Sequence, residues 1–163
     1  MIIVNTCHIT DEPLFLDGTE TKDILELEND ADRIPVSDIT YNLIATKSGS
    51  GQDLLVNGTA TFQLKSSCVR CMKEVVIPIV TENLCIFREK VPDQEVDITE
   101  DVREELLLAL PDYIHCSEDC KGLCCHCGAN LNDGPCECNS SDDTEDLSSN
   151  EDNPWNVLDQ LKQ

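Results

Sequence analysis

The most constraining feature of this sequence is a short segment, residues 116–138, in which seven of 23 residues are cysteine. Four further cysteines lie elsewhere, so the chain of 163 residues contains eleven. Cysteine usage this high is typical of chains that are cross-linked by disulfide bonds or by metal ions. The rest of the sequence must decide between these two kinds of cross-link.

The lack of a secretory signal and of a membrane span favours metal in a reducing compartment. The start, MIIVNTCHITDE, lacks the charged region and the long apolar run of a secretory signal, and no segment approaches the ~20 apolar residues of a membrane span. We therefore expect a cytoplasmic protein, whose thiols stay reduced. The net charge of -22 opposes binding to nucleic acid and to anionic membranes, and it favours basic partners or serves solubility alone.

Eight of the cysteines form four close pairs, two of them with the Cys-x-x-Cys spacing by which a tight turn aims two sulfurs at one ion. The pairs are Cys68 with Cys71, Cys116 with Cys120, Cys124 with Cys127, and Cys136 with Cys138. Eight thiolates fill two tetrahedral Zn²⁺ sites. We expect the first two pairs to bind one structural zinc ion and the last two pairs to bind a second. A single zinc ion held by the two Cys-x-x-Cys pairs alone stays open.

Other uses of the cysteines are disulfide bonds, a thiol redox device or an iron–sulfur cluster. A catalytic zinc is disfavoured, because such a site keeps an open position and usually includes histidine or carboxylate ligands. Three cysteines remain outside the pairs. Cys7 and Cys85 lie in apolar runs and are predicted to be buried. Cys125, between two expected ligands, has no assigned role.

Residues 36–90 carry the clearest β-strand pattern. Between residues 56 and 64 the apolar side chains and Gly58 occupy even positions and polar side chains lie between them. The β-rich runs before and after this segment predict a three-stranded antiparallel meander, with Cys68 and Cys71 near the tip of its second hairpin. Pro78 indicates an edge strand or a bulge. Residues 1–35 contain short apolar runs compatible with strands, with Asp17-Gly18 as a turn.

Residues 97–110 are predicted to form the main helix. Asp97 is the expected N-cap with Glu100 three residues on, and Pro111 follows the last apolar residues. An apolar stripe that includes Val102 and Leu106 predicts that this helix packs against the sheet. The expected fold class is α+β, an antiparallel meander with one packed helix and a zinc-stapled, cysteine-rich segment at 116–138.

The predicted domain organisation follows from composition. Residues 1–138 are expected to form a single domain. Residues 139–153 are acidic without a basic residue, which predicts a disordered linker. Residues 154–163 are expected to form a short helix, with Trp155 as a candidate contact to a partner.

Three basic residues interrupt the general acidity around the first Cys-x-x-Cys pair. They are Lys65, Arg70 and Lys73. A hairpin tip stiffened by zinc and carrying these side chains is a candidate contact for RNA phosphate. The alternative is an ordinary solvated turn.

Four motifs occur in an order that resembles the YceD-like family, the large ribosomal RNA subunit accumulation proteins of bacteria and plastids. They are CVRC after an alternating strand, EELLLALP, CKGLCCHCGANLN, and NPWNVLDQLK at the end. This sequence has Cys125 where the family commonly has proline, and Trp155 where it commonly has arginine.

The resemblance implies a link to the synthesis, processing or stability of large-subunit ribosomal RNA, without catalytic activity. We therefore expect a non-enzymatic factor in ribosome biogenesis that binds a large-subunit ribosomal protein or the precursor RNA, and neither a membrane nor a small-molecule substrate. The sequence contains no P-loop, GxSxG, HExxH or glycine-rich dinucleotide motif. The alternative is a cytosolic thiol redox or zinc-binding adaptor protein.

Overall fold

The computed structural model describes residues 1–9, 12–27, 30, 32–48, 52–92 and 94–138. The chain divides into two compact units, Met1–Gly122 and Leu123–Gln163, which are described separately. The predicted linker, the predicted C-terminal helix and Trp155 lie outside the described residues. The predicted domain boundaries remain predictions.

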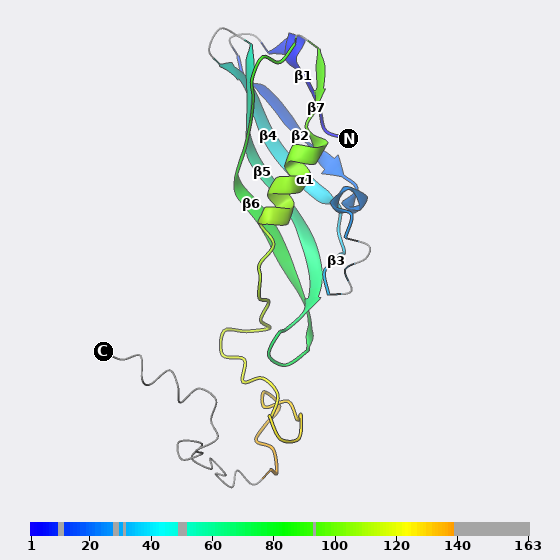
Figure 1. Ribbon diagram of the computed structural model, residues 1–163, viewed down its shortest axis with the longest axis vertical. Helices are drawn as coiled ribbons and strands as arrows, with labels where there is room; N and C mark the ends of the chain where they lie inside the picture. Colours follow the sequence, from blue (N-terminus) through cyan, green and yellow to red (C-terminus); the bar gives the residue numbers. More distant parts are fainter. Residues whose placement is uncertain (10–11, 28–29, 31, 49–51, 93, 139–163) are drawn as a thin grey trace, which may run out of the picture. The chain divides into compact units, whose positions relative to one another are not determined.

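The first unit is built on an antiparallel sheet of five strands (Figure 1). These strands are β2 (Leu14–Glu20), β3 (Ile34–Pro35), β4 (Ile39–Ser48), β5 (Asp53–Ser67) and β6 (Glu74–Arg88). The central strand is β5, which pairs with β4 and the short β3 along one side and with β6 along the other. The predicted meander is therefore present as β4, β5 and β6. The sheet also contains β2 and β3, which were not predicted as members of it.

Two further strands, β1 (Ile3–Asn5) and β7 (Glu95–Asp97), pair with each other in a small second sheet. Two short 3₁₀ helices, η1 (Thr6–His8) and η2 (Lys22–Leu25), follow β1 and β2.

The predicted turn at Asp17-Gly18 is wrong, because both residues lie inside β2 and pair with Asn42 and Tyr41 of β4. No helix among the described residues is long and apolar enough to cross a membrane.

The alternation seen in the sequence defines the core. Even-numbered side chains of β5, such as Val56, Phe62 and Leu64, are buried, and the odd-numbered ones point to the opposite face. Helix α1 (Thr99–Leu108) covers the buried face, where Val102 and Leu106 join the same hydrophobic cluster. Figure 1 shows this helix in front of β5 and β6.

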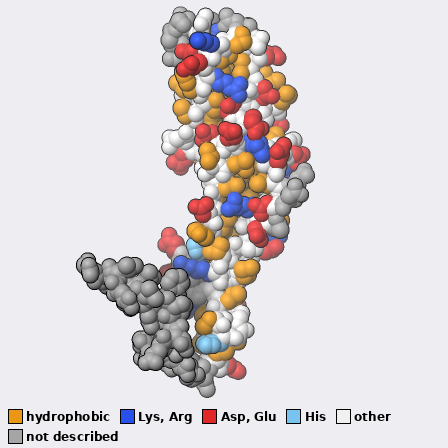
Figure 2. All heavy atoms as spheres, viewed as in Figure 1, with side chains coloured by type: hydrophobic (Ala, Val, Ile, Leu, Met, Phe, Trp, Pro, Cys, Tyr) orange, Lys and Arg blue, Asp and Glu red, His pale blue; other side chains and the backbone are white. Residues whose placement is uncertain are grey.

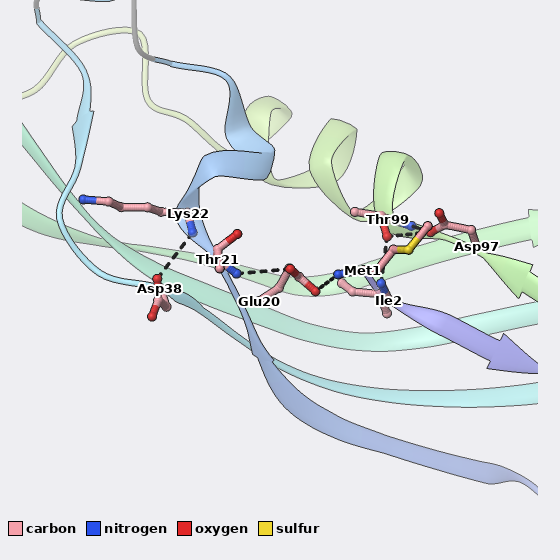
Figure 3. Close-up of polar contacts among 8 residues, drawn as sticks. All are labelled: Met1, Ile2, Glu20, Thr21, Lys22, Asp38, Asp97 and Thr99. Atoms are coloured by element: carbon pink, nitrogen blue, oxygen red, sulfur yellow. Dashed lines mark hydrogen bonds and ion pairs between the residues drawn. The ribbon is translucent and has the colours of Figure 1, made fainter.

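The helix is shorter than predicted, and its start differs. Asp97 is the last residue of β7 rather than the N-cap, a position that Ile98 occupies without a side-chain hydrogen bond. The Asp97 carboxylate accepts hydrogen bonds from the backbone N–H and the hydroxyl of Thr99, and the same hydroxyl accepts one from the N–H of Ile2 (Figure 3). The helix ends at Leu108, before Pro111, and the Leu108 side chain is 81% exposed.

The strand β6 is an edge strand, as Pro78 indicated. Gln63, opposite Pro78, uses its carbonyl and N–H for hydrogen bonds to Val36 and Ser37 on the other side of β5. Pro78 therefore lies in a non-hydrogen-bonded pair and its nitrogen points away from β5, where no donor is needed. The register shift in this pair of strands lies further along, between Gly58 and Ala60, rather than at Pro78.

Candidate metal centres

The first Cys-x-x-Cys pair lies in the turn that joins β5 to β6. The N–H of Cys68 donates to the carbonyl of Lys73 at 2.9 Å, and the N–H of Met72 donates to the carbonyl of Cys68 at 2.9 Å. These bonds close a compact loop that directs both thiols to one side. Met72, directly after the second cysteine, takes the left-handed conformation with φ 59°.

The second Cys-x-x-Cys pair forms the same turn in the second unit. The N–H of Cys124 donates to the carbonyl of Ala129 at 2.8 Å, and the N–H of Gly128 donates to the carbonyl of Cys124 at 2.9 Å. Gly128, directly after Cys127, has φ 72°. Both turns are therefore of one type, which we call a knuckle, and both require a left-handed residue after the second cysteine.

The first knuckle is completed by two cysteines from the loop after α1. The sulfurs of Cys68, Cys71, Cys116 and Cys120 all lie within 4.8 Å of one another. The Cys68 and Cys120 sulfurs are 3.8 Å apart and the Cys71 and Cys116 sulfurs are 3.6 Å apart. In a tetrahedron with zinc–sulfur bonds of about 2.3 Å, sulfurs are about 3.8 Å apart. A disulfide needs about 2.05 Å. The spacing therefore fits a metal ion held by four thiolates.

The second knuckle is completed within its own unit. The sulfurs of Cys124, Cys127, Cys136 and Cys138 also lie within 4.8 Å of one another, and those of Cys136 and Cys124 are 3.4 Å apart. The division of the eight cysteines into these two groups is the one that the sequence analysis favoured. Each group can hold a metal ion.

The two groups differ in burial. Three of the four cysteines in the first group are buried, with exposures of 0% for Cys68, 6% for Cys71 and 4% for Cys120. In the second group only Cys124 is buried, and Cys127 is exposed. The first site is thus enclosed by the protein, whereas water reaches the second.

The thiols of Cys68 and Cys71 in the first group differ widely in pKa. Burial raises the pKa of Cys68, but backbone hydrogen bonds from Cys116, Cys71 and Arg70 lower it to about 6. A backbone hydrogen bond from Lys73 lowers the pKa of Cys71, but burial and neighbouring thiols raise it to about 12. One thiolate therefore forms readily and blocks the ionisation of the next, unless a cation binds.

The thiols of Cys124 and Cys138 in the second group also differ widely in pKa. Backbone hydrogen bonds from Cys127 and His126, helped by the Cys136 thiol, lower the pKa of Cys124 to about 6. The thiol of Cys127 and burial raise the pKa of Cys138 to about 12. Each group is thus arranged so that a metal ion displaces the remaining protons on binding.

Arg70 holds the loop that supplies Cys116 and Cys120, a role the sequence analysis did not predict. Its guanidinium donates to the carbonyl of Cys120 at 3.0 Å and to that of Glu118 at 3.4 Å. Gly122 adopts φ +78° nearby, and a Cβ added there would lie 3.1 Å from the Arg70 carbonyl oxygen. No local sequence signal marks these contacts, because they join residues about 50 positions apart.

The other predicted contact residues do not form one free basic patch. The ammonium of Lys65 pairs with Glu74 at 2.8 Å, and Arg70 is held by the loop carbonyls. Lys73 is exposed. At the tip itself the exposed side chains include Val69 and Met72, with exposures of 50% and 66%.

Two of the three remaining cysteines were predicted wrongly. Cys7 and Cys85 are exposed, not buried. Alternation in β6 turns Leu84 and Ile86 toward the core and Cys85 away from it, and only Thr6 is buried in the turn that contains Cys7. Cys125 is exposed beside the second group but does not belong to it.

Comparison with known proteins agrees with the motif order. The family model of the large ribosomal RNA subunit accumulation protein YceD matches residues 56–162. An uncharacterized protein of Mycobacterium leprae is 28% identical over 107 residues, which cover 55% of this chain and 48% of the relative. A chloroplastic YCED homologue of Arabidopsis thaliana, named as a large ribosomal RNA subunit accumulation protein, is 40% identical over 45 residues.

These matches differ in extent. The Arabidopsis match covers 28% of this chain and 14% of the relative, so the chain spans at most about half the length of these two relatives. No solved structure matches. The family match includes most of β5, the first knuckle, α1 and both cysteine groups. The chain therefore belongs to the YceD family of large ribosomal RNA subunit accumulation proteins.

Proposed function

We propose that this protein is a non-enzymatic, cytoplasmic factor in large-subunit ribosome biogenesis. It supports accumulation of large-subunit ribosomal RNA by binding a ribosomal protein or the precursor RNA. The observation that carries this proposal is the family match over residues 56–162, because the family is named for accumulation of this RNA.

The metal centres support a structural role in this proposal. Each group offers four thiolates, which fill a tetrahedral Zn²⁺ site and leave no position open for a substrate or a reactive water. An S₄ set selects zinc over harder cations such as Mg²⁺ or Ca²⁺. The ions then fasten the loop after α1 to the β5–β6 turn and fold the second knuckle.

The surface charge favours a basic protein as the direct partner. The net charge of -22 repels the phosphate backbone, and two of the three basic residues near the tip already bind other groups of the chain. An acidic surface that shields a basic ribosomal protein before assembly is the version we favour. Contact with precursor RNA through Lys73 is the second version.

A pull-down from the native cells, divided into nuclease-treated and untreated halves, tests the proposal. We expect large-subunit ribosomal proteins in both halves. Proteins that disappear with nuclease indicate contact through RNA, and a Lys73→Glu variant should then lose them while a Lys22→Glu control keeps them. Absence of ribosomal components from both halves would contradict the proposal and favour the thiol redox or adaptor function.

Elemental analysis tests the metal part separately. Protein purified under reducing conditions should contain two zinc ions per chain, and the Cys68→Ser variant should contain one. The matched control is Cys85→Ser, since Cys85 is exposed and lies outside both groups. Wild-type protein without zinc would overturn the structural role proposed for the cysteines.

A further inference from the structure

The sheet face opposite to α1, here called the outer face, carries no charged side chain in its central part. Its central part consists of the even-numbered residues from 40 to 46 in β4 and the odd-numbered residues from 55 to 63 in β5. These are Thr40, Asn42, Ile44, Thr46, Leu55, Asn57, Thr59, Thr61 and Gln63. None is charged, although 27% of the residues in the chain are. On the side seen in Figure 2, which carries α1, acidic side chains are scattered along the whole sheet unit.

An apolar band crosses all four long strands of the outer face. Phe15 of β2 pairs directly with Ile44 of β4, and Leu55 of β5 pairs directly with Phe87 of β6. Ile44 and Leu55 are diagonal neighbours, because Leu55 lies opposite Thr46. The exposed fractions are 67% for Phe15, 39% for Ile44 and 54% for Phe87.

The chemistry of this face points to a protein partner without complementary charge. Two exposed phenylalanines in a continuous apolar band mark an interaction site rather than ordinary surface. The central part of the face offers no lysine or arginine for phosphate and no carboxylate for a basic protein. The partner surface that best complements the outer face is therefore a flat protein surface without charge.

We propose that the outer face binds a second copy of this chain, sheet against sheet, around a two-fold axis. Two chains that each carry a charge of -22 repel each other, so they can associate closely only through surfaces without charge. The central part of the outer face meets this condition, with Asp17, Asp53 and Lys65 at its margins, and two-fold symmetry makes one such face sufficient.

The size of the face also fits a dimer. Four strands about 4.8 Å apart, over about ten residues of about 3.3 Å each, give a projected area on the order of 600 Å². A stable interface buries about 800 Å² of accessible surface per partner, and the relief of side chains makes accessible area larger than its projection. Two such sheets pack about 10 Å apart, with the bands of both copies inside.

Sedimentation velocity on the full chain with its metal bound tests the proposal. Wild-type protein should sediment as a dimer at about 50 µM, which lies above the micromolar dissociation constants of moderately stable interfaces. The F15K/F87K variant should sediment as a monomer at the same concentration. Its control is L108K/Y113K, which makes the same charge change at side chains with exposures of 81% and 73% outside the sheet. This control should stay dimeric.

Alkylation of Cys85 gives a second readout, because this exposed thiol lies two residues from Phe87 on the same face. Its rate relative to the exposed Cys7 should rise several-fold in F15K/F87K and remain unchanged in the control. A monomeric wild-type protein, or a dimer that survives F15K/F87K with Cys85 equally reactive, overturns the proposal. Circular dichroism confirms that the variants are folded.

Discussion

At the scale of single residues, two backbone positions limit which amino acids the chain accepts. Met72 and Gly128 occupy the same left-handed position in the two knuckles, with φ 59° and φ 72°. A side chain there meets its own backbone, at a cost of about 1–2 kcal/mol. Glycine avoids this cost, so the first knuckle is the more strained of the two.

Replacing Met72 by glycine should therefore stabilise the metal-bound protein. We expect a gain of about 0.5–1 kcal/mol, since part of the relief is offset by the greater freedom of glycine in the unfolded chain. Urea unfolding under saturating zinc measures the change. Met72→Ala is the control, because alanine retains the Cβ and should show no gain. A lower stability of Met72→Gly than of Met72→Ala would contradict this explanation.

Gly58 is a position where the strands leave no room for a side chain. A Cβ added there would lie 2.1 Å from the carbonyl oxygen of Asn42 and 2.8 Å from the Cα of Leu43. Backbone atoms of β4 cannot move without breaking the ladder. Gly58→Ala should therefore destabilise the protein by about 1–3 kcal/mol, the usual range for overpacking.

Gly18→Ala provides the matched comparison for Gly58→Ala in a urea titration. Its added Cβ would lie 2.7 Å from the Tyr41 hydroxyl, the far end of a side chain that can move. We expect a clearly smaller loss of stability at this position. Equal losses at both glycines would show that the close approach of β4 and β5 is not what selects glycine at position 58.

At the scale of secondary-structure elements, Thr99 connects the junction of β7 and α1 to the distant N-terminus of the chain. Its hydroxyl accepts from the Ile2 N–H at 2.7 Å and donates to Asp97 at 2.5 Å, which ties the start of α1 to the end of β7 and to the residue before β1 (Figure 3). The hydrogen bonds from Thr99 lower the pKa of Asp97. The start of the helix is therefore held by tertiary contacts instead of a side-chain cap.

Thr99→Val should destabilise the protein by about 1 kcal/mol at neutral pH, the typical value of a lost hydrogen bond. Because Asp97 has a lowered pKa in the folded state, its contribution is present above its ordinary pKa and is lost as the pH falls through the lowered value. The difference between wild type and Thr99→Val should thus shrink in acid. Urea unfolding of both proteins at each pH measures it, and a difference independent of pH would contradict the role of Asp97.

At the scale of the whole molecule, the two compact units depend on metal to different degrees. The first unit has a hydrophobic core that extends from Ile2 to Ile114 and includes side chains from the long strands and α1. In residues 123–138 the one buried side chain is that of Cys124. A segment with so little apolar burial cannot offset its own conformational entropy without cross-links.

Removal of metal by a chelator should therefore unfold residues 123–138 and leave the sheet intact. We expect amide resonances of this segment to collapse to the random-coil region in an NMR spectrum, while those of β4 and β5 keep their dispersion. Adding zinc back should restore the lost resonances. Loss of the sheet resonances on chelation would show instead that the first metal centre is required for the core itself.

The sequence by itself determined the local features of this protein. Alternation between residues 56 and 64 identified β5, and spacing identified the four close cysteine pairs, since a short turn brings the two ligands of a pair together. Helix α1 was predicted from its apolar stripe, although its bounds were two residues too wide at each end. These features depend on neighbours within a few positions, which a single sequence displays.

The tertiary structure decided what depends on distant residues. The pairing of β1 with β7, the membership of β2 and β3 in the sheet, and the use of Arg70 to hold the loop after α1 all join distant segments. The exposure of Cys85 and the lack of space at Gly58 likewise follow from strand register. Register is selected by the packing of the whole core, because a shift of one residue would turn every buried side chain outward.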